Sequence, residues 1–311
     1  MRKRGLLEIF NLAKKNNKII FLGSDLGHKT LDDFKEACPN QFYMEGISEQ
    51  NIVGMAAGLA QEGKIVYINT IATFLTRRCF DQIAMDVATG NHNVRLYANG
   101  GGVVYAPLGP THLAVDDIAL MRSIPGMTIV HPSDSEEMAR LIKASEKWQG
   151  PIYIRLCRGG ETQTSQAENG FEIGKAITLK ESGEITICAT GVMVYRALEV
   201  AKKLEEEFKI QVGVINIHSI APLDKPAIEE AAKRSSLIVT FEEHNITGGL
   251  GSAVGEVLSE SLLPNRPSFK RYGFPDCYPD KYGQQDLIIS HYGLDTETLT
   301  KKVSKLYRSL N

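Results

Sequence analysis

The sequence predicts an α/β protein with two domains, each a mostly parallel sheet flanked by helices. Continuous apolar runs alternate along the chain with helical patterns of about 10–15 residues, which is the order found in parallel sheets. Regularly spaced polar residues do not interrupt the apolar runs, as expected for strands that helices cover on both faces. A chain of 311 residues is long enough for two such domains.

The first half of the chain predicts one series of alternating strands and helices. The apolar runs indicate strands at 18–25, 41–45, 65–72, 94–102, 127–133 and 151–158. Helical patterns lie at 6–15, 31–37, 78–89, 116–123 and 135–147, and a further helix begins at Glu49. We assign residues 1–165 to this first domain.

A second alternating series follows a polar, glycine-rich stretch. Residues 159–182 lack apolar periodicity, which indicates a linker, and we place the linker at 166–182 and the second domain at 183–311. The second domain is expected to contain strands at 184–191, 211–219, 236–243 and 269–275. Its helices are expected at 195–208, 225–234, 251–263 and 296–310.

Composition and charge argue against several classes of protein. Hydrophobic residues make up 43% and charged residues 23% of the chain, as in soluble globular proteins. The net charge of −2 argues against nucleic acid or an anionic membrane as partner, and no apolar run reaches the roughly 18 residues of a membrane helix. The basic N-terminus continues as an amphipathic helix rather than a signal peptide, so we expect a cytoplasmic protein. Five scattered cysteines without a Cys-x-x-Cys pair indicate reduced thiols rather than a metal cluster.

One carboxylate stands at the entrance of an otherwise apolar helix, in the stretch MEGISEQNIVGMAAGLA at 44–60. Ser48 is placed as an N-cap, and Glu49 falls in the first turn, where the helix dipole favours an anion. Glu49 can therefore be a simple capping acid. The absence of charge in the following turns points instead to a helix that enters a core, where a buried carboxyl group needs a partner. Both interpretations stay open on this segment alone.

Two further stretches place unusual side chains after strands. Phe74 follows the strand at 65–72, at the end where ligands gather in parallel sheets, and its ring is either a stacking surface for a planar group or a core residue. The glycines at 100–102 end the next strand and leave its backbone open to a ligand. His112 follows in G-P-T-H, and it is either a structural or a catalytic histidine.

The order of the motifs resembles the transketolase family of thiamine-diphosphate enzymes, from its pyrimidine-binding domain to its C-terminal domain. In the first domain the resemblance rests on G-S-D-L, S-E-Q, A-T-F-L, G-P-T-H, I-P-G-M, H-P-S-D and I-R-L-C-R-G, in that order. The second domain adds VINIHSIAPLD and EEHNITGGLGSAVGE. Each motif alone is weak, but the ordered set is specific and covers nearly the whole chain.

The resemblance implies a set of cofactor-binding residues. Glu49 matches the glutamate that hydrogen-bonds N1′ of the cofactor's aminopyrimidine ring and favours the tautomer whose 4′-nitrogen removes the C2 proton. Phe74 matches the aromatic residue on which that ring stacks, and Asp25 matches an acid near the subunit contact. Arg77 or Arg78 is expected to border the pocket, and we assign Arg77 to cofactor binding.

The resemblance also implies substrate-binding residues. His112 matches the G-P-T-H histidine, which faces the substrate and acts in acid–base and electrostatic catalysis. Arg158, or alternatively Arg155, matches the arginine that receives a sugar phosphate, a role that suits a planar guanidinium. Asn99 stands where many transketolases carry a phosphate-contacting histidine, and Leu108 stands where they carry an acid before G-P-T-H. Both departures concern substrate recognition and leave the cofactor-activating residues intact.

One larger departure from the family concerns the metal. Family members bind the cofactor's diphosphate through a divalent metal at a G-D-G…N motif, and this chain has no Asp-Gly dipeptide. The glycines of TGGLGS could imitate an anion nest, but they belong to the C-terminal domain, which contributes no metal site in the family. The resemblance thus implies no metal ligands in this chain. It implies that an N-terminal transketolase subunit holds the diphosphate of thiamine diphosphate and Mg²⁺, in an α2β2 assembly.

Three functions are weighed on these residues. The first is a transketolase-like transferase of aldehyde or ketone residues in carbohydrate metabolism, which moves a two-carbon ketol unit from a ketose, expected to be a phosphate, to an aldehyde. The second is the β subunit of a 2-oxoacid dehydrogenase E1 component or a related acyl-transferring enzyme, which the missing acid at Leu108 favours. The third is a non-catalytic subunit, against which the joint presence of Glu49, Phe74 and His112 argues. Because G-P-T-H favours the first, we expect a subunit of a split transketolase.

Overall fold

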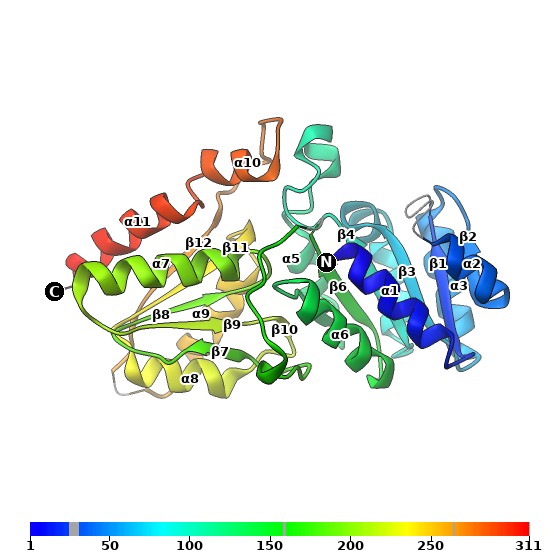
Figure 1. Ribbon diagram of the computed structural model, residues 1–311, viewed down its shortest axis with the longest axis horizontal. Coiled ribbons are helices and arrows are strands. Elements are labelled where there is room, and N and C mark those ends of the chain that lie inside the picture. Colours follow the sequence, from blue (N-terminus) through cyan, green and yellow to red (C-terminus); the bar gives the residue numbers. More distant parts are fainter. Residues whose placement is uncertain (25–30, 158–159, 264, 311) are drawn as a thin grey trace.

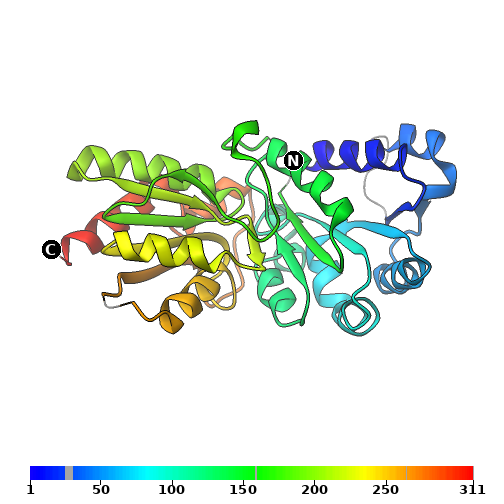
Figure 2. The ribbon, with the colours of Figure 1, turned by 90° about the horizontal axis from the view of Figure 1, so that it is seen from below.

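The computed structural model describes residues 1–24, 31–157, 160–263 and 265–310, and these form two α/β units side by side (Figure 1, Figure 2). In spatial order, the first sheet contains β10 (Ser219–Ala221), β5 (Thr128–Val130), β6 (Ile152–Leu156), β4 (Val94–Asn99), β3 (Ile65–Ile71), β1 (Ile19–Gly23) and β2 (Phe42–Met44). The second contains β12 (Ser268–Phe274), β11 (Leu237–Asn245), β8 (Ile185–Ala189), β9 (Val212–Asn216) and β7 (Ile177–Lys180). Among the strands of the described ranges, only β10–β5 and β7–β9 pair antiparallel. The prediction of two mostly parallel sheets is confirmed.

Helices cover both faces of the first sheet, as the continuous apolar strands require. One face carries α1 (Arg2–Ala13), α2 (Asp32–Ala37) and α6 (Ser135–Lys147), whose apolar residues share one buried core. The opposite face carries α3 (Glu49–Gln61), η2 (Phe74–Arg78), α4 (Phe80–Gln82), η3 (Ile83–Ala88) and α5 (Asp117–Arg122). η2 and η3 are π-helical turns, so the helix predicted at 78–89 is an irregular helical segment.

The second sheet is covered in the same way. Its first face packs against α7 (Met193–Phe208), α10 (Gln285–His291) and α11 (Thr296–Arg308). Its second face packs against α8 (Lys225–Arg234) and α9 (Leu250–Glu260). Both sheets therefore lie between two helical layers, and their carboxyl-terminal strand ends are left to carry ligand-binding groups.

The predicted linker at 166–182 is wrong in its second half, because β7 lies there. β7 is an antiparallel edge strand, in which buried Ile177 and half-buried Leu179 alternate with more polar residues. Four residues are too few to give a recognisable period. β10 and α10 were not predicted either. β10 has three residues, and so short a strand is defined by its pairing partner rather than by its own sequence. α10 is defined by its packing in the core of the second domain. The domain limits themselves stay a prediction.

Each domain contributes a segment to the other. β10 comes from the second half of the chain, yet Ser219 pairs with Val130 of β5 in the first sheet. In return, apolar residues from the stretch 103–115 of the first half are buried in the core that α7, α10 and α11 form on the second sheet. The interface between the domains is therefore part of both cores. None of the described helices has the length and apolar character needed to cross a membrane.

Candidate active site

Three of the predicted site residues lie at the carboxyl-terminal edge of the first sheet. Glu49 begins α3, which follows β2, and Phe74 begins the helical turn η2 just after β3. His112 ends a short 3₁₀ turn in the connection from β4 to α5. Because the carboxyl ends of parallel strands meet at one edge, residues that are far apart in sequence converge there.

Glu49 is buried, with only 3% of the residue exposed. Arg78 Nη1 donates a hydrogen bond to Glu49 Oε2 at 2.5 Å, and the two side chains form an ion pair. Ser48 precedes the helix without a capping hydrogen bond from its side chain. The dipole of α3 also favours the negative charge of Glu49 at this position. Glu49 is therefore more than an exposed capping acid, since its carboxylate faces a cation inside the site.

The same arginine connects Glu49 to the other two residues. The guanidinium carbon of Arg78 lies 4.5 Å from the centre of the Phe74 ring, in a cation–π contact. The Phe74 ring in turn meets His112 edge to face, with ring centres 5.1 Å apart at an angle of 66°. Glu49, Arg78, Phe74 and His112 thus form one continuous row. The rings of Phe74 and His112 are both half-buried, which argues against the interpretation of Phe74 as a core residue.

Arg77, which we assigned to cofactor binding, points elsewhere in this structure. Its Nε and Nη2 donate to the two carboxylate oxygens of Asp116, at 3.0 and 2.9 Å, just before α5. Its guanidinium also lies 5.9 Å from the centre of the Tyr278 ring. The contact with Glu49 belongs to its neighbour Arg78, so a role for Arg77 at the cofactor stays a prediction. Arg77 and Arg78 lie three and four residues after Phe74, and both spacings place side chains on one helix face, so no sequence signal selects Arg78.

The remaining predicted residues lie in different environments. Asn99 is only 1% exposed; its Nδ2 donates to Asn69 Oδ1 at 2.6 Å and to the Thr70 carbonyl at 3.1 Å. Its Oδ1 has no hydrogen-bond partner among the described residues. Leu108 is 55% exposed, in the same connection as His112. Asp25 and Arg158 lie outside the residues that the structure describes.

Arg155, the alternative phosphate-binding arginine, is fully buried. It forms an ion pair with Asp117, with Nε 2.7 Å from Oδ2, and it donates to the carbonyls of Ala114 and Glu243 at 2.9 and 3.0 Å. Burial alone would raise the pKa of Asp117, but the charges of Arg155 and His244 and the hydrogen bonds from Arg155 and Tyr153 together outweigh it and hold that pKa below its usual range. Arg155 is therefore engaged inside the protein and is not placed to receive a phosphate.

The glycines of TGGLGS do form an anion-binding helix start, and the chain fills it with its own carboxylate. Leu250 N–H donates to Glu242 Oε2 at 2.7 Å, and Gly251 N–H donates to Glu242 Oε1 at 2.9 Å. Burial raises the pKa of Glu242 to about 7, although these two hydrogen bonds oppose that rise. Glu242 therefore takes the place of an anionic ligand at this helix start.

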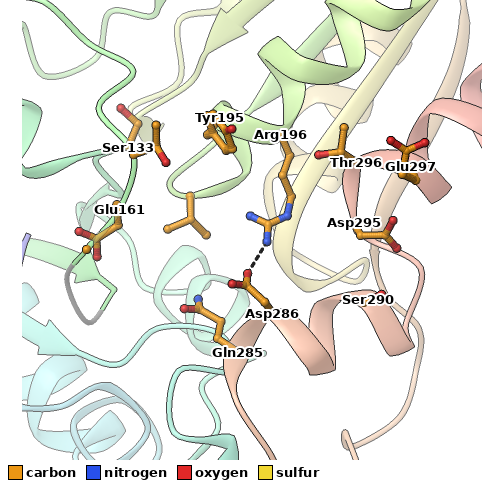
Figure 3. A pocket seen from close by; sticks show the side chains of 13 residues that line it. Ser133, Glu161, Tyr195, Arg196, Gln285, Asp286, Ser290, Asp295, Thr296 and Glu297 are labelled. Carbon is orange, nitrogen blue, oxygen red and sulfur yellow. Dashed lines mark hydrogen bonds and ion pairs between the residues drawn. The ribbon is translucent and has the colours of Figure 1, made fainter.

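A cavity of about 600 Å³ between the two domains was not foreseen from the sequence (Figure 3). Ser133 and Glu161 come to it from the first domain, and Tyr195, Arg196, Gln285 and Asp286 from the second. Arg196 and Asp286 form an ion pair of 2.6 Å within it. Its lining is separate from the row of Glu49, Arg78, Phe74 and His112.

Comparison with known proteins agrees with this geometry. The family described as "Transketolase, pyrimidine binding domain" matches residues 5–161, and "Transketolase, C-terminal domain" matches residues 174–299. The chain belongs to the transketolase family. Solved transketolase variants from Pichia stipitis share its fold, with TM-scores of 0.79 at 19–20% identity, and the chain spans 45% of their length.

Some relatives of this transketolase chain are subunits of its own size. It is 38% identical over 295 residues to a subunit of the apulose-4-phosphate transketolase of Phocaeicola vulgatus, covering 94% of this chain and 93% of the relative. It is 33% identical over 305 residues to "6-deoxy-6-sulfo-D-fructose transketolase subunit SqwH" of a Clostridium species, covering 97% and 93%. A solved structure named "Split gene transketolase, inactive beta4 tetramer" superposes with a TM-score of 0.88 at 36% identity, covering 98% of this chain and 97% of that one.

A second group of relatives is longer than this chain. "1-deoxy-D-xylulose-5-phosphate synthase 1" of Geobacter sulfurreducens is 36% identical over 287 residues, which cover 91% of this chain but 44% of the synthase. These relatives are transketolase subunits and a synthase, so the transketolase interpretation is supported over the E1 alternative.

Proposed function

We propose that this chain is the pyrimidine-binding subunit of a split, thiamine-diphosphate-dependent transketolase. The complete enzyme would transfer a two-carbon ketol unit from a ketose donor to an aldehyde acceptor. One arrangement carries the proposal: the buried carboxylate of Glu49 and the Phe74 ring both contact the planar guanidinium of Arg78. The ring centres of Phe74 and His112 are 5.1 Å apart.

The residues fit an aminopyrimidine ring. The Arg78 guanidinium is planar, donates an N–H to Glu49 and lies on the face of Phe74. An aminopyrimidine ring that hydrogen-bonds Glu49 and stacks on Phe74 would make the same two contacts that the Arg78 guanidinium makes. When bound, thiamine diphosphate supplies the carbon nucleophile that breaks the carbon–carbon bond beside a carbonyl.

The chain's own side chains have separate roles in this proposal. Glu49 would hold the pyrimidine through a hydrogen bond to its carboxylate, and such a charge-assisted hydrogen bond contributes about 1.5–3 kcal/mol. Phe74 orients the ring by stacking. His112 Nδ1 already contacts Thr111 Oγ1 at 2.9 Å, so Nε2 is the nitrogen that meets a substrate oxygen and stabilises charge on it.

The diphosphate and Mg²⁺ are assigned to a partner subunit that carries the G-D-G…N motif. The described residues hold no group of three or more His, Cys, Asp or Glu side chains suited to a metal ion, and the full sequence has no Asp-Gly dipeptide. One relative is named as a subunit of its transketolase, and a solved neighbour is named as a split-gene "beta4 tetramer", so both support a multi-chain enzyme. We propose an α2β2 complex in the cytoplasm.

The donor is proposed to be a ketose with an anionic group at its far end. Two relatives are named for apulose 4-phosphate and for 6-deoxy-6-sulfo-D-fructose, which share this chemistry. Arg158 and Asn99 are the proposed contacts of this end of the substrate. The exposed apolar Leu108, which stands in place of an acid, favours pyruvate as a second candidate donor. Turnover with a ketose phosphate but not with pyruvate would remove that candidate.

Proton exchange at C2 of thiamine diphosphate tests the proposal in the reconstituted complex. Glu49→Gln should slow this exchange by about 10²–10⁴-fold, the usual range for lost acid–base assistance. Glu45→Gln is the matched control, because Glu45 is exposed and lies just before the same helix. If Glu49→Gln exchanges as fast as Glu45→Gln, the assigned role of Glu49 is wrong.

A further inference from the structure

The loop that carries His112 is closed at its base by its own backbone. We call residues 103–113 the His112 loop. The N–H of Gly102 donates to the Ala114 carbonyl at 2.9 Å, and the N–H of Ala114 donates to the Gly102 carbonyl at 3.0 Å. Whatever holds this pair of residues therefore holds both ends of the loop.

The His112 loop packs into the core of the second domain rather than its own. β4 and α5, which flank the loop, contribute buried residues to the core of the first domain. The apolar residues of the loop are instead buried together with residues of β8, β11, β12, α7 and α10. The loop residues in that second core are Val103, Ala106 and Leu113, followed directly by Val115.

Glu243 of the second domain is hydrogen-bonded to the start of this loop. The N–H of Val103 donates to Glu243 Oε1 at 2.8 Å, and both groups are fully buried. Gln285 Nε2 donates to both carboxylate oxygens of Glu243, each at 2.9 Å. The carboxylate is thus fixed between the loop and α10, where Gln285 borders the interdomain cavity (Figure 3).

The other end of the loop is tied to the same part of the second domain through Arg155, which belongs to β6 of the first domain. Arg155 Nη2 donates to the Ala114 carbonyl and to the backbone carbonyl of Glu243, at 2.9 and 3.0 Å. Gly102 adopts a φ of +72°, and a Cβ on it would collide with the carboxyl group of Glu243. Only glycine allows this close approach of the loop backbone to Glu243.

We propose that Glu243 is a positioning residue that places His112 for catalysis. The C-terminal domain then has a function in the reaction, because it fixes the loop on which a substrate-facing histidine stands. This inference rests on the proposed function of His112. It assigns Glu243 no contact with substrate, since the carboxylate acts through Val103 and the loop backbone.

Two adjacent buried glutamates allow a matched test in the reconstituted complex. Glu243 and Glu242 are both fully buried and both accept backbone N–H groups, but Glu242 bonds the start of α9 and not the loop. Glu243→Gln should lower kcat about 10- to 100-fold, because small displacements of a catalytic group have effects of this size. KM for the ketose and C2-proton exchange, which depends on Glu49, should stay within about threefold of wild type. Glu242→Gln should lower the melting temperature by about as much as Glu243→Gln does, and it should leave kcat within about twofold of wild type.

A rescue variant separates positioning from general damage. In Glu243→Gln combined with Gln285→Glu, the amide oxygen at 243 still accepts from Val103, and its amide N–H₂ donates to the carboxylate at 285. This double variant should recover most of the lost kcat. An unchanged kcat in Glu243→Gln, or an equal loss in Glu242→Gln, would overturn the proposal.

Two further measurements keep the result decisive. The rate at which diethyl pyrocarbonate modifies His112, followed by mass spectrometry, should change in Glu243→Gln and not in Glu242→Gln. The modification rate reports the position of the His112 loop even if the complex has another activity. Failure of this inference can therefore be told apart from failure of the proposed function. If Glu243→Gln gives no folded complex, Gln285→Leu replaces it as the test variant, because Gln285 is only half-buried. A wild-type kcat in Gln285→Leu would reject the role of Glu243.

Discussion

In the proposed function, Arg78 occupies the place that the cofactor's ring would take. Its guanidinium pairs with Glu49 at 2.5 Å and lies 4.5 Å from the centre of the Phe74 ring. Its side chain is 41% exposed, whereas Glu49 is buried, so Arg78 can turn into solvent while the other two residues stay in place. Binding of an aminopyrimidine to Glu49 and Phe74 therefore has to displace Arg78 first.

Removal of this arginine should tighten cofactor binding. In the complex, Arg78→Gln is expected to lower the Kd for thiamine diphosphate about fivefold, because an ion pair with one exposed partner contributes about 1 kcal/mol that binding would otherwise break. Calorimetry measures this directly. Arg234→Gln is the control, since exposed Arg234 pairs with Glu230 on α8, away from the site. Weaker binding in Arg78→Gln would mean that Arg78 contacts the bound cofactor rather than competing with it.

The buried pair of Arg155 and Asp117 makes a prediction about stability. Tyr153 also donates its hydroxyl to Asp117 Oδ2 at 2.6 Å, so the buried carboxylate is hydrogen-bonded by both Arg155 and Tyr153. Arg155→Met should lower the free energy of unfolding by about 3–5 kcal/mol, because it leaves a buried carboxylate without its counter-ion. Urea unfolding measures this loss. The double variant with Asp117→Asn should lose less, and a single variant that loses under about 1 kcal/mol would contradict the assignment.

At the scale of elements, long helices with clear caps were predictable and short elements were not. α6 and α8 match the expected ranges, because Asp134 and Asp224 cap them and their apolar residues keep a helical period. β7, β10 and α10 escaped prediction, since their identity depends on pairing with or packing on segments far along the chain. The local sequence does not indicate which distant segments these elements contact.

The candidate site was predictable only in part for the same reason. Glu49, Phe74 and His112 could be brought together because the carboxyl ends of parallel strands meet at one edge. The choice between Arg77 and Arg78 depends on how the turn after β3 is rotated, which two successive arginines do not reveal. The role of Glu243 needed the packing of the His112 loop on the second domain, which no local pattern indicates.

The segment between β9 and β10 buries His218. Its ring stacks on Phe171 with centres 4.3 Å apart, and Nδ1 contacts Ser219 Oγ at 3.0 Å. Nε2 has no hydrogen-bond partner among the described residues. Burial, assisted by the charge of Arg140, lowers the pKa of His218 to about 4. The protein therefore keeps this histidine neutral at a pH where an unfolded chain would protonate it.

This lowered pKa predicts a loss of stability in acid. Between pH 6.5 and about 4 the unfolded state binds the proton more readily, so the free energy of unfolding should fall as pH falls, by up to about 3 kcal/mol from His218. Urea unfolding at pH 7 and pH 5 should show a smaller difference in His218→Asn than in wild type. The same substitution at exposed His291 is the control. An unchanged pH dependence in His218→Asn would show that other groups cause the acid sensitivity.

At the scale of the whole molecule, the site lies among exposed apolar side chains. Ile47 precedes Glu49 by two residues, and Leu108 lies in the His112 loop. Tyr278 and Tyr282 reach the same region from the second domain, where Tyr278 faces Arg77 and Tyr282 lies against Gly109. Exposed apolar groups around a binding site are typical of surfaces that meet another chain. This arrangement supports a site that a second subunit completes.

The isolated chain should consequently bind its cofactor poorly. It offers one charged hydrogen bond and one stacking surface, which together correspond to about −4 kcal/mol and a Kd near the millimolar range. With the partner subunit and Mg²⁺, the Kd for thiamine diphosphate should fall at least about 100-fold, because the metal then anchors the diphosphate. Calorimetry on the pure chain and on the complex compares the two states, and Glu49→Gln in the complex tests whether the tight site uses this chain. Micromolar binding by the pure chain would show that it holds the diphosphate itself, and the division of the site between two subunits would then be wrong.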